Sequence, residues 1–213
     1  MAQDIDSEIR DLIKSLPSYN DLKRVEARKA LVAIGGPAVP SLIEALKDPN
    51  KLMRWEAAKA LGEIGDPRSA PMLVEALEDE QFEVRWLAAN ALIEMNVNGL
   101  KPLFRALMEH ADSVVLREGA HRVLHALAKG DLGEYVAPVL VDLEDFDSVA
   151  RIPATASQAL EKLERFQKKA APEGSLFLRQ FTARMPGRSA LDSAPHGVIA
   201  PHHHTPKRAS KWG

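Results

Sequence analysis

The sequence predicts an all-α solenoid, a superhelical stack of helix pairs, and three observations favour this fold. Three segments superimpose almost without gaps at a period near thirty residues. Each segment carries two apolar stripes with the spacing of α-helices. The chain is rich in Ala, Leu, Glu, Lys and Arg, and only 5% of its residues are aromatic. Such a period is the signature of a repeat array, in which neighbouring helix pairs bury each other's apolar faces.

The repeats are defined by recurring residues. The three aligned segments are RVEARKALVAIGGPAVPSLIEALKDP from Arg24, RWEAAKALGEIGDPRSAPMLVEALEDE from Arg54 and RWLAANALIEMNVNGLKPLFRALMEH from Arg85. A fourth copy starts at Arg117 and has a longer loop between its helices, and a fifth, diverged half starts near Asp147. We therefore expect about four to five helix pairs. We call the four arginines that begin the copies the ladder arginines.

The first helix of each copy has apolar residues at positions i, i+4, i+7, i+8 and i+11. In the second copy these residues are Met53, Ala57, Ala60, Leu61 and Ile64. This spacing places one stripe on one helix face, and the small alanines allow neighbouring helices to approach closely. The pair Gly35-Gly36 and Gly65 then predict the helix ends, because the residue after a helix often adopts a left-handed conformation.

The second helix of each copy is marked by a recurring proline. These prolines are Pro40, Pro71, Pro102 and Pro138. Proline fits the first turn of a helix because its missing N–H would be unpaired there anyway. Each second helix then carries a Leu-rich face, such as Leu42, Ile43 and Leu46. We therefore expect every second helix to begin at its proline.

The two ends of the array are predicted from their patterns. Residues 4–16 form an amphipathic pattern that would cover the first repeat, with Asp4 or Asp6 as the N-cap. Near the other end, Pro153 either begins a helix or kinks one. We expect residues 1–169 to form the solenoid. Residues 170–213 are rich in Pro, Gly and Ser and have no sustained period, so we expect an extended or disordered basic tail.

Charge is distributed unevenly along the chain. Residues 1–171 contain 22 Lys and Arg against 28 Asp and Glu, whereas residues 172–213 contain 6 against 2, so the body is −6 and the tail +4. An acidic body does not attract phosphate backbones, which argues against nucleic acid as its partner. The chain has no Cys, no signal-peptide core and no stretch apolar enough to span a bilayer. We therefore expect a soluble, cytoplasmic protein.

The phrases RWEAAKALGEIGDPRSAPMLVEALED and VRWLAANAL resemble the HEAT-like repeats of the phycobilisome-lyase (E–Z type) group. The resemblance covers roughly residues 20–166. It implies the solenoid fold, but the group includes bilin lyase subunits, iron-dependent hydroxylases, assembly chaperones and adaptors. Fold analogy does not choose among these functions.

The sequence lacks the residue sets that two classes of HEAT-like enzyme use. HEAT-like deoxyhypusine hydroxylases bind two irons through His-Glu pairs, and the positions that match these pairs hold no His. The matching pairs are Val25-Glu26, Trp55-Glu56, Trp86-Leu87 and Glu118-Gly119. HEAT-like alkylpurine DNA glycosylases use a basic concave face, which the acidic second helices do not supply. We therefore predict no catalytic residues and no cofactor, and we keep a bilin lyase or isomerase subunit as the alternative.

Several residues have both a functional and a structural interpretation. The ladder arginines either bind anions or pair between repeats, with Asp48, Asp79 and Asp112 as caps of first helices. Trp55 and Trp86 form either an aromatic platform or inter-repeat packing. His121 and His125 lie four apart on one helix, but no third metal ligand is evident. The weak metal candidates in the tail are His202, His203 and His204, together with His196.

The predicted function is protein–protein interaction. Second helices line the concave side of such solenoids, and here their side chains are mostly acidic, which favours a partner with a basic surface. The predicted partner-binding residues are Glu44, Glu75, Glu78, Arg105 and Asp142 in the body and Leu176, Phe177 and Phe181 in the tail. We therefore expect a scaffold, an assembly factor or an accessory subunit of a larger complex.

Overall fold

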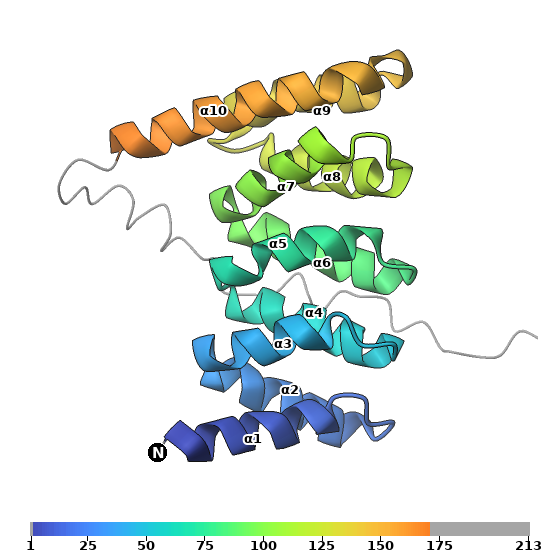
Figure 1. Cartoon of the computed structure of the whole chain (residues 1–213), viewed down its shortest axis with the longest axis vertical. Coiled ribbons are helices and arrows are strands. Elements are labelled where there is room, and N and C mark those ends of the chain that lie inside the picture. The colour runs from blue at the N-terminus through green and yellow to red at the C-terminus, as the bar shows by residue number, and fades with distance from the viewer. Residues whose placement is uncertain (1, 171–213) are drawn as a thin grey trace, which may run out of the picture.

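The structure is a computed structural model that describes residues 2–170, and these residues form an all-α stack of helices (Figure 1). The first helices of the repeats are α2 (Asp21–Ile34), α4 (Lys51–Ile64), α6 (Phe82–Met95) and α8 (Val114–Leu127). The second helices are α3 (Val39–Ala45), α5 (Ala70–Glu75), α7 (Val97–Glu109) and α9 (Gly133–Glu144). The end helices are α1 (Ala2–Ser15) and α10 (Ile152–Ala170), so the predicted all-α solenoid is confirmed.

Three short 3-10 helices in residues 2–170 extend second helices: η1 (Gly36–Ala38) precedes α3, and η2 (Pro67–Ser69) and η3 (Ala76–Glu78) flank α5. A fourth, η4 (Phe146–Arg151), leads directly into α10. Within the described chain no helix is long and apolar enough to cross a membrane.

Helices α2 and α4 end at glycines, as predicted. Gly35 has φ 71° and Gly65 has φ 67°, and each N–H donates to the carbonyl four residues before it. A side chain at these positive φ values would be strained, so glycine is the residue that can end the helix there. Pro40 and Pro71 lie in the first turns of α3 and α5, so these two second helices begin at their prolines as predicted.

The expectation that a second helix begins at its proline is wrong for the other two repeats. Pro102 and Pro138 lie inside α7 and α9, because both helices begin earlier than predicted. Asn96 takes φ 56° and ends α6, and α7 starts at the next residue. This abrupt turn brings the backbone at Gly99 so close to α6 that a Cβ there would lie 2.6 Å from the Leu92 carbonyl oxygen. Helix α1 also begins two residues earlier than expected, which places Asp4 in its first turn.

Amide and hydroxyl side chains, not the predicted aspartates, cap three first helices. Asn20, Asn50 and Ser113 each accept a backbone N–H from the first turn of α2, α4 and α8. The carboxylates of Asp48 and Asp79 accept the N–H two residues later, before the helix starts. These aspartates therefore order the turns between repeats.

The ladder arginines have a common structural role. In each case Nη1 donates to the carbonyl oxygen six residues earlier, in the turn that precedes the helix. The bonds are Arg24 to Ser18 at 2.9 Å, Arg54 to Asp48 at 2.9 Å, Arg85 to Asp79 at 2.8 Å and Arg117 to Ala111 at 2.6 Å. Each arginine thus satisfies a turn carbonyl that has no helical partner.

The core is continuous along the stack, and α4 packs against α6 along much of its length. Ala57, Ala58 and Ala60 of α4 and Ala88 and Ala89 of α6 are buried. Their small side chains let the two helices approach closely, as predicted.

The last helix leaves the repeating pattern. Pro153 lies in the first turn of α10, so this helix begins at the proline and is not kinked by it. Helix α10 packs against α7 and α9, on the second-helix side of the stack. The rings of Tyr135 in α9 and Phe166 in α10 have centroids 5.5 Å apart. The predicted division near Lys169 coincides with the end of the described residues and stays a prediction.

Candidate protein-interaction surface

Three predicted site residues are exposed on the second helices. Glu44 follows Pro40 by four residues and Glu75 follows Pro71 by four, so they occupy the same position in neighbouring repeats. Glu78 lies one turn beyond Glu75. We call Glu44, Glu75 and Glu78 the acidic row. Core residues such as Leu42 and Leu73 lie on the opposite faces of these helices, so Glu44 and Glu75 point away from the core.

The acidic row is only weakly neutralised by neighbouring side chains. Glu44 lies 3.8 Å from Lys47, and both side chains are more than half exposed. Such a surface pair contributes little. The Glu78 carboxylate accepts a hydrogen bond from the Ser113 hydroxyl, which caps α8. Glu78 therefore also links two repeats, whereas Glu75 has no ion pair within the described residues.

Two other predicted residues lie beneath or beside α10. Asp142 occupies the position of Glu44 and Glu75 in its own repeat, but it is buried, and its carboxylate bonds to Arg151 and Thr155. It is therefore not part of the exposed surface. Arg105 is exposed on α7 and faces Glu164 of α10 at 3.8 Å. Helix α10 thus covers the second-helix surface at the C-terminal end of the stack. The acidic row, on α3, α5 and η3, stays exposed.

The predicted tail residues lie outside the described residues. These are Leu176, Phe177 and Phe181 as partner contacts and His196, His202, His203 and His204 as metal candidates. Their roles stay predictions.

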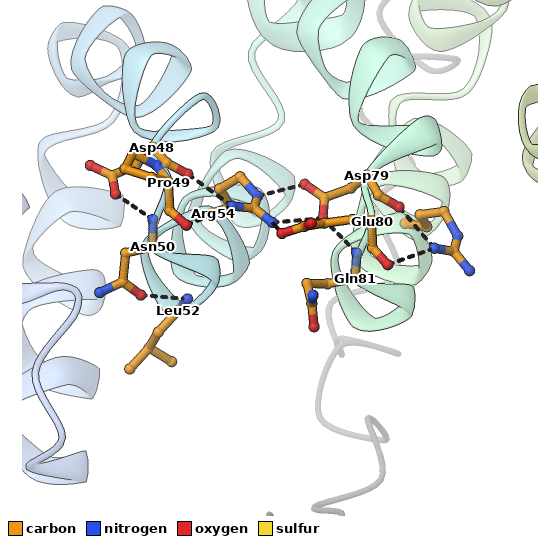
Figure 2. A network of polar contacts seen from close by, with 9 residues as sticks. Asp48, Pro49, Asn50, Leu52, Arg54, Asp79, Glu80 and Gln81 are labelled. Carbon is orange, nitrogen blue, oxygen red and sulfur yellow. Dashed lines mark hydrogen bonds and ion pairs between the residues drawn. The ribbon is translucent and has the colours of Figure 1, made fainter.

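Pairing between repeats is confirmed for two of the ladder arginines. Arg54 donates from Nε to Asp79 at 2.7 Å and from Nη2 to Glu80 at 2.9 Å, which joins α4 to the turn of the next repeat (Figure 2). These bonds raise the pKa of Arg54. Arg24 lies 2.7 Å from Glu56 of α4. Arg85 and Arg117 bond turn carbonyls within the described chain.

Glu56 is a fully buried carboxylate between α2 and α4. The Nε atoms of Arg24 and Arg28 lie 2.7 and 3.0 Å from its oxygens, although they are not aligned as hydrogen bonds. Arg28 also pairs with Glu63. Burial raises the pKa of Glu56, while the charges of Arg28, Arg24 and Lys59 oppose this effect.

The raised pKa of Glu56 gives a pH-dependent stability. The folded protein holds this proton more tightly than the unfolded chain, so the stabilisation from Glu56 falls as pH rises through its folded pKa. The Glu56→Gln variant has no such loss. We expect its free energy of unfolding, relative to wild type, to rise across the pH range above the ordinary glutamate pKa of about 4.3, measured by urea unfolding. A constant difference across this range would contradict the assignment.

The aromatic and histidine residues pack against neighbouring side chains. The Lys59 ammonium lies 5.5 Å from the ring centroid of Trp55, and the Arg122 guanidinium lies 5.4 Å from that of Trp86. His121 and His125 stack with centroids 5.8 Å apart. The described residues contain no group of three or more His, Cys, Asp or Glu placed to hold a metal ion.

Sequence reasoning did not single out Lys59, Asn90 and Arg122, which the structure brings beside the two tryptophans. The available signal was the repeat alignment, because each lies five residues after a ladder arginine. The positions of the arginines and tryptophans alone do not identify these three residues.

Residues 9–93, from within α1 through most of α6, match the family described as HEAT repeats. This part of the chain is therefore similar to HEAT repeats. The match does not distinguish the phycobilisome-lyase subgroup from other HEAT repeats, so that part of the resemblance stays a prediction. The search of curated proteins gave no significant match.

Among solved structures, the chain is similar to an engineered protein at 19% identity and a TM-score of 0.39, over 83% of this chain and 94% of the other. It is also similar to a designed armadillo repeat protein in complex with the peptide (KR)4, at 17% identity and a TM-score of 0.35, over 83% and 97% of the two chains. Similarity at this level carries no argument about function.

Proposed function

We propose that this helical repeat protein is a protein–protein interaction module, an assembly factor or accessory subunit, that binds a basic segment of its partner on the acidic row. Repeat stacks provide extended binding surfaces because each repeat adds one more set of outward side chains. The observation that carries the proposal is the exposure of Glu44 and Glu75 at equivalent positions of neighbouring repeats. In this proposal the module acts by binding its partner.

The repeat spacing indicates which basic segment would fit. Packed helices lie about 8–10 Å apart, and an extended chain advances about 3.3 Å per residue. Cations at every third residue of an extended segment would therefore meet Glu44 and Glu75 in turn. Complementary charge of this kind speeds encounter and fixes register.

The test uses a fluorescein-labelled (Lys-Gly-Ser)4 peptide and fluorescence anisotropy. The double variant Glu44→Lys/Glu75→Lys is expected to weaken peptide binding by at least about tenfold, because each reversal replaces attraction with repulsion. Glu83→Lys/Glu94→Lys is the matched control, since it makes the same charge change at exposed positions of α6. Equal losses in both variants would show that net charge, and not the acidic row, determines binding.

The tail provides a second arm of the same experiment. Residues 172–213 carry a net charge of +4 by sequence, and we propose that they act as an interaction arm. A chain of residues 1–171 binds the basic peptide more tightly if the tail covers the acidic row, and equally if it does not.

The alternative function, a subunit of a bilin lyase or isomerase, would instead be supported by a visible-absorbing adduct after co-expression with a bilin and an acceptor protein.

A further inference from the structure

The first helices carry a second row of polar side chains, five residues after each ladder arginine. Its members are Lys29 of α2, Lys59 of α4, Asn90 of α6 and Arg122 of α8. We call these four residues the first-helix row. They occupy the same position in consecutive repeats, so neighbouring members are carried by helices that lie about 8–10 Å apart.

The middle of the row lies on the helix face opposite to core residues of the same helix. Trp55 and Lys59 are four residues apart and share one face of α4. Ala57 and Leu61 lie on the opposite face and are fully buried in the core. Lys59 is nevertheless only 8% exposed, because Trp55 and the neighbouring helices flank its side chain.

Asn90 has a buried amide donor with no acceptor. Arg122 donates from Nη2 to Asn90 Oδ1 at 3.2 Å, and its guanidinium lies over the ring of Trp86. A guanidinium has only donors, so Asn90 must present its oxygen to Arg122 and turn Nδ2 away. Asn90 is 8% exposed, and Nδ2 has no hydrogen-bond partner within the described part of the chain. Leaving a buried donor unpaired is costly, and a ligand oxygen would remove that cost.

The cations of the row also lack carboxylate partners. Among the described residues, no carboxylate oxygen lies within 4.0 Å of the charged nitrogens of Lys29, Lys59 or Arg122, and ion pairs instead engage arginines such as Arg24 and Arg54. Lys59 does lie near Glu56, but that carboxylate already faces two arginines. The row is therefore a positive strip on a body whose net charge is −6.

We infer that the first-helix row binds an extended acidic segment of a partner protein. Its carboxylates would meet the cations of the row, and a backbone carbonyl would accept the free hydrogen bond of Asn90. Side chains of the segment would lie against Trp55 and Trp86. Carboxylates at about every third residue match the spacing of the helices. The chain's own tail is basic, so its charge opposes this position.

This site is independent of the acidic row. The two rows lie on different helix layers and carry opposite charge. A protein with both surfaces can hold an acidic and a basic segment together, as an adaptor does.

The test measures anisotropy of a fluorescein-labelled (Glu-Gly-Ser)4 peptide with the full chain. Lys59→Gln and Arg122→Gln are each expected to weaken binding about tenfold. Asn90→Asp keeps the shape and the contact to Arg122, but it removes the donor and adds a negative charge. We expect this variant to lose about a hundredfold. Lys51→Gln is the control, since Lys51 is exposed on α4 outside the row.

Several outcomes would overturn the inference. One is equal binding of a neutral (Gln-Gly-Ser)4 peptide, and another is unchanged binding in Asn90→Asp. Thermal midpoints are measured for each variant, and if Asn90→Asp does not fold, the exposed Lys29→Gln decides, with an expected loss of about threefold at an unchanged midpoint. The Glu44→Lys/Glu75→Lys variant must retain the acidic peptide. Tighter binding there than in the Glu83→Lys/Glu94→Lys control, which makes the same charge change, would show that the peptide contacts the acidic row's side of the stack, and the first-helix site would be rejected.

Discussion

The Leu92→Asp variant is expected to lose at least about 4 kcal/mol of unfolding free energy, because it places an unpaired carboxylate in an apolar core. Leu92 lies in α6 at the centre of the stack and is 0% exposed. Repeats are stabilised mainly by their nearest neighbours, so loss of α6 packing separates the two halves of the array. Thermal unfolding followed by circular dichroism measures the effect.

Leu22→Asp is the matched control for this variant. Leu22 lies in the first turn of α2 and is 75% exposed, so the same chemical change should alter stability by less than about 0.5 kcal/mol. If both variants kept the wild-type thermal midpoint, the assignment of Leu92 to the core would be wrong.

The Arg54→Met variant is expected to lower the free energy of unfolding by about 3–5 kcal/mol. Arg54 bonds to Asp79, Glu80 and two turn carbonyls, and its removal leaves the largely buried Asp79 carboxylate without its cation (Figure 2). Urea unfolding measures the loss, and the fitted slope shows whether unfolding stays cooperative.

Arg85→Met separates pairing between repeats from the turn contact. Arg85 makes the same hydrogen bond to the carbonyl six residues earlier. Within the described chain, its side chain donates hydrogen bonds to turn carbonyls and not to carboxylates. We expect a loss of about 1 kcal/mol, as for an ordinary hydrogen bond. Equal losses in the two variants would place the stabilisation in the turn and not in the contact between repeats.

Local chain chemistry explains which features of the fold could be predicted. Gly35 and Gly65 end helices because glycine, which has no Cβ, adopts a positive φ without strain. Pro40 and Pro71 begin helices for a similarly local reason.

Two other features depend on contacts between distant segments. Asn96 ends α6 in a conformation that glycine more commonly adopts, and Gly99 allows α7 to start against the previous helix. The placement of α10 beside α7 and α9 is set by tertiary packing, which repeat periodicity does not contain. A repeating pattern predicts the next repeat, not the helix that departs from it.

The same distinction applies to the candidate surfaces. Repeat register correctly placed Glu44 and Glu75 on exposed second-helix positions. It failed for Asp142 because α10 covers that equivalent position. The lack of an acceptor at Asn90 requires the positions of Arg122 and Trp86, which belong to different helices.

A 1H–15N NMR titration of the 23.4 kDa protein with the (Lys-Gly-Ser)4 peptide tests the central claim most directly. Binding on the acidic row predicts saturable shift changes at Glu44, Glu75 and the adjacent amides of α3 and α5. Amides around Asn90 and Arg122 should keep their shifts. Saturating peptide without changes in α3 and α5, or with changes confined to the first-helix row, would contradict the proposed interaction surface.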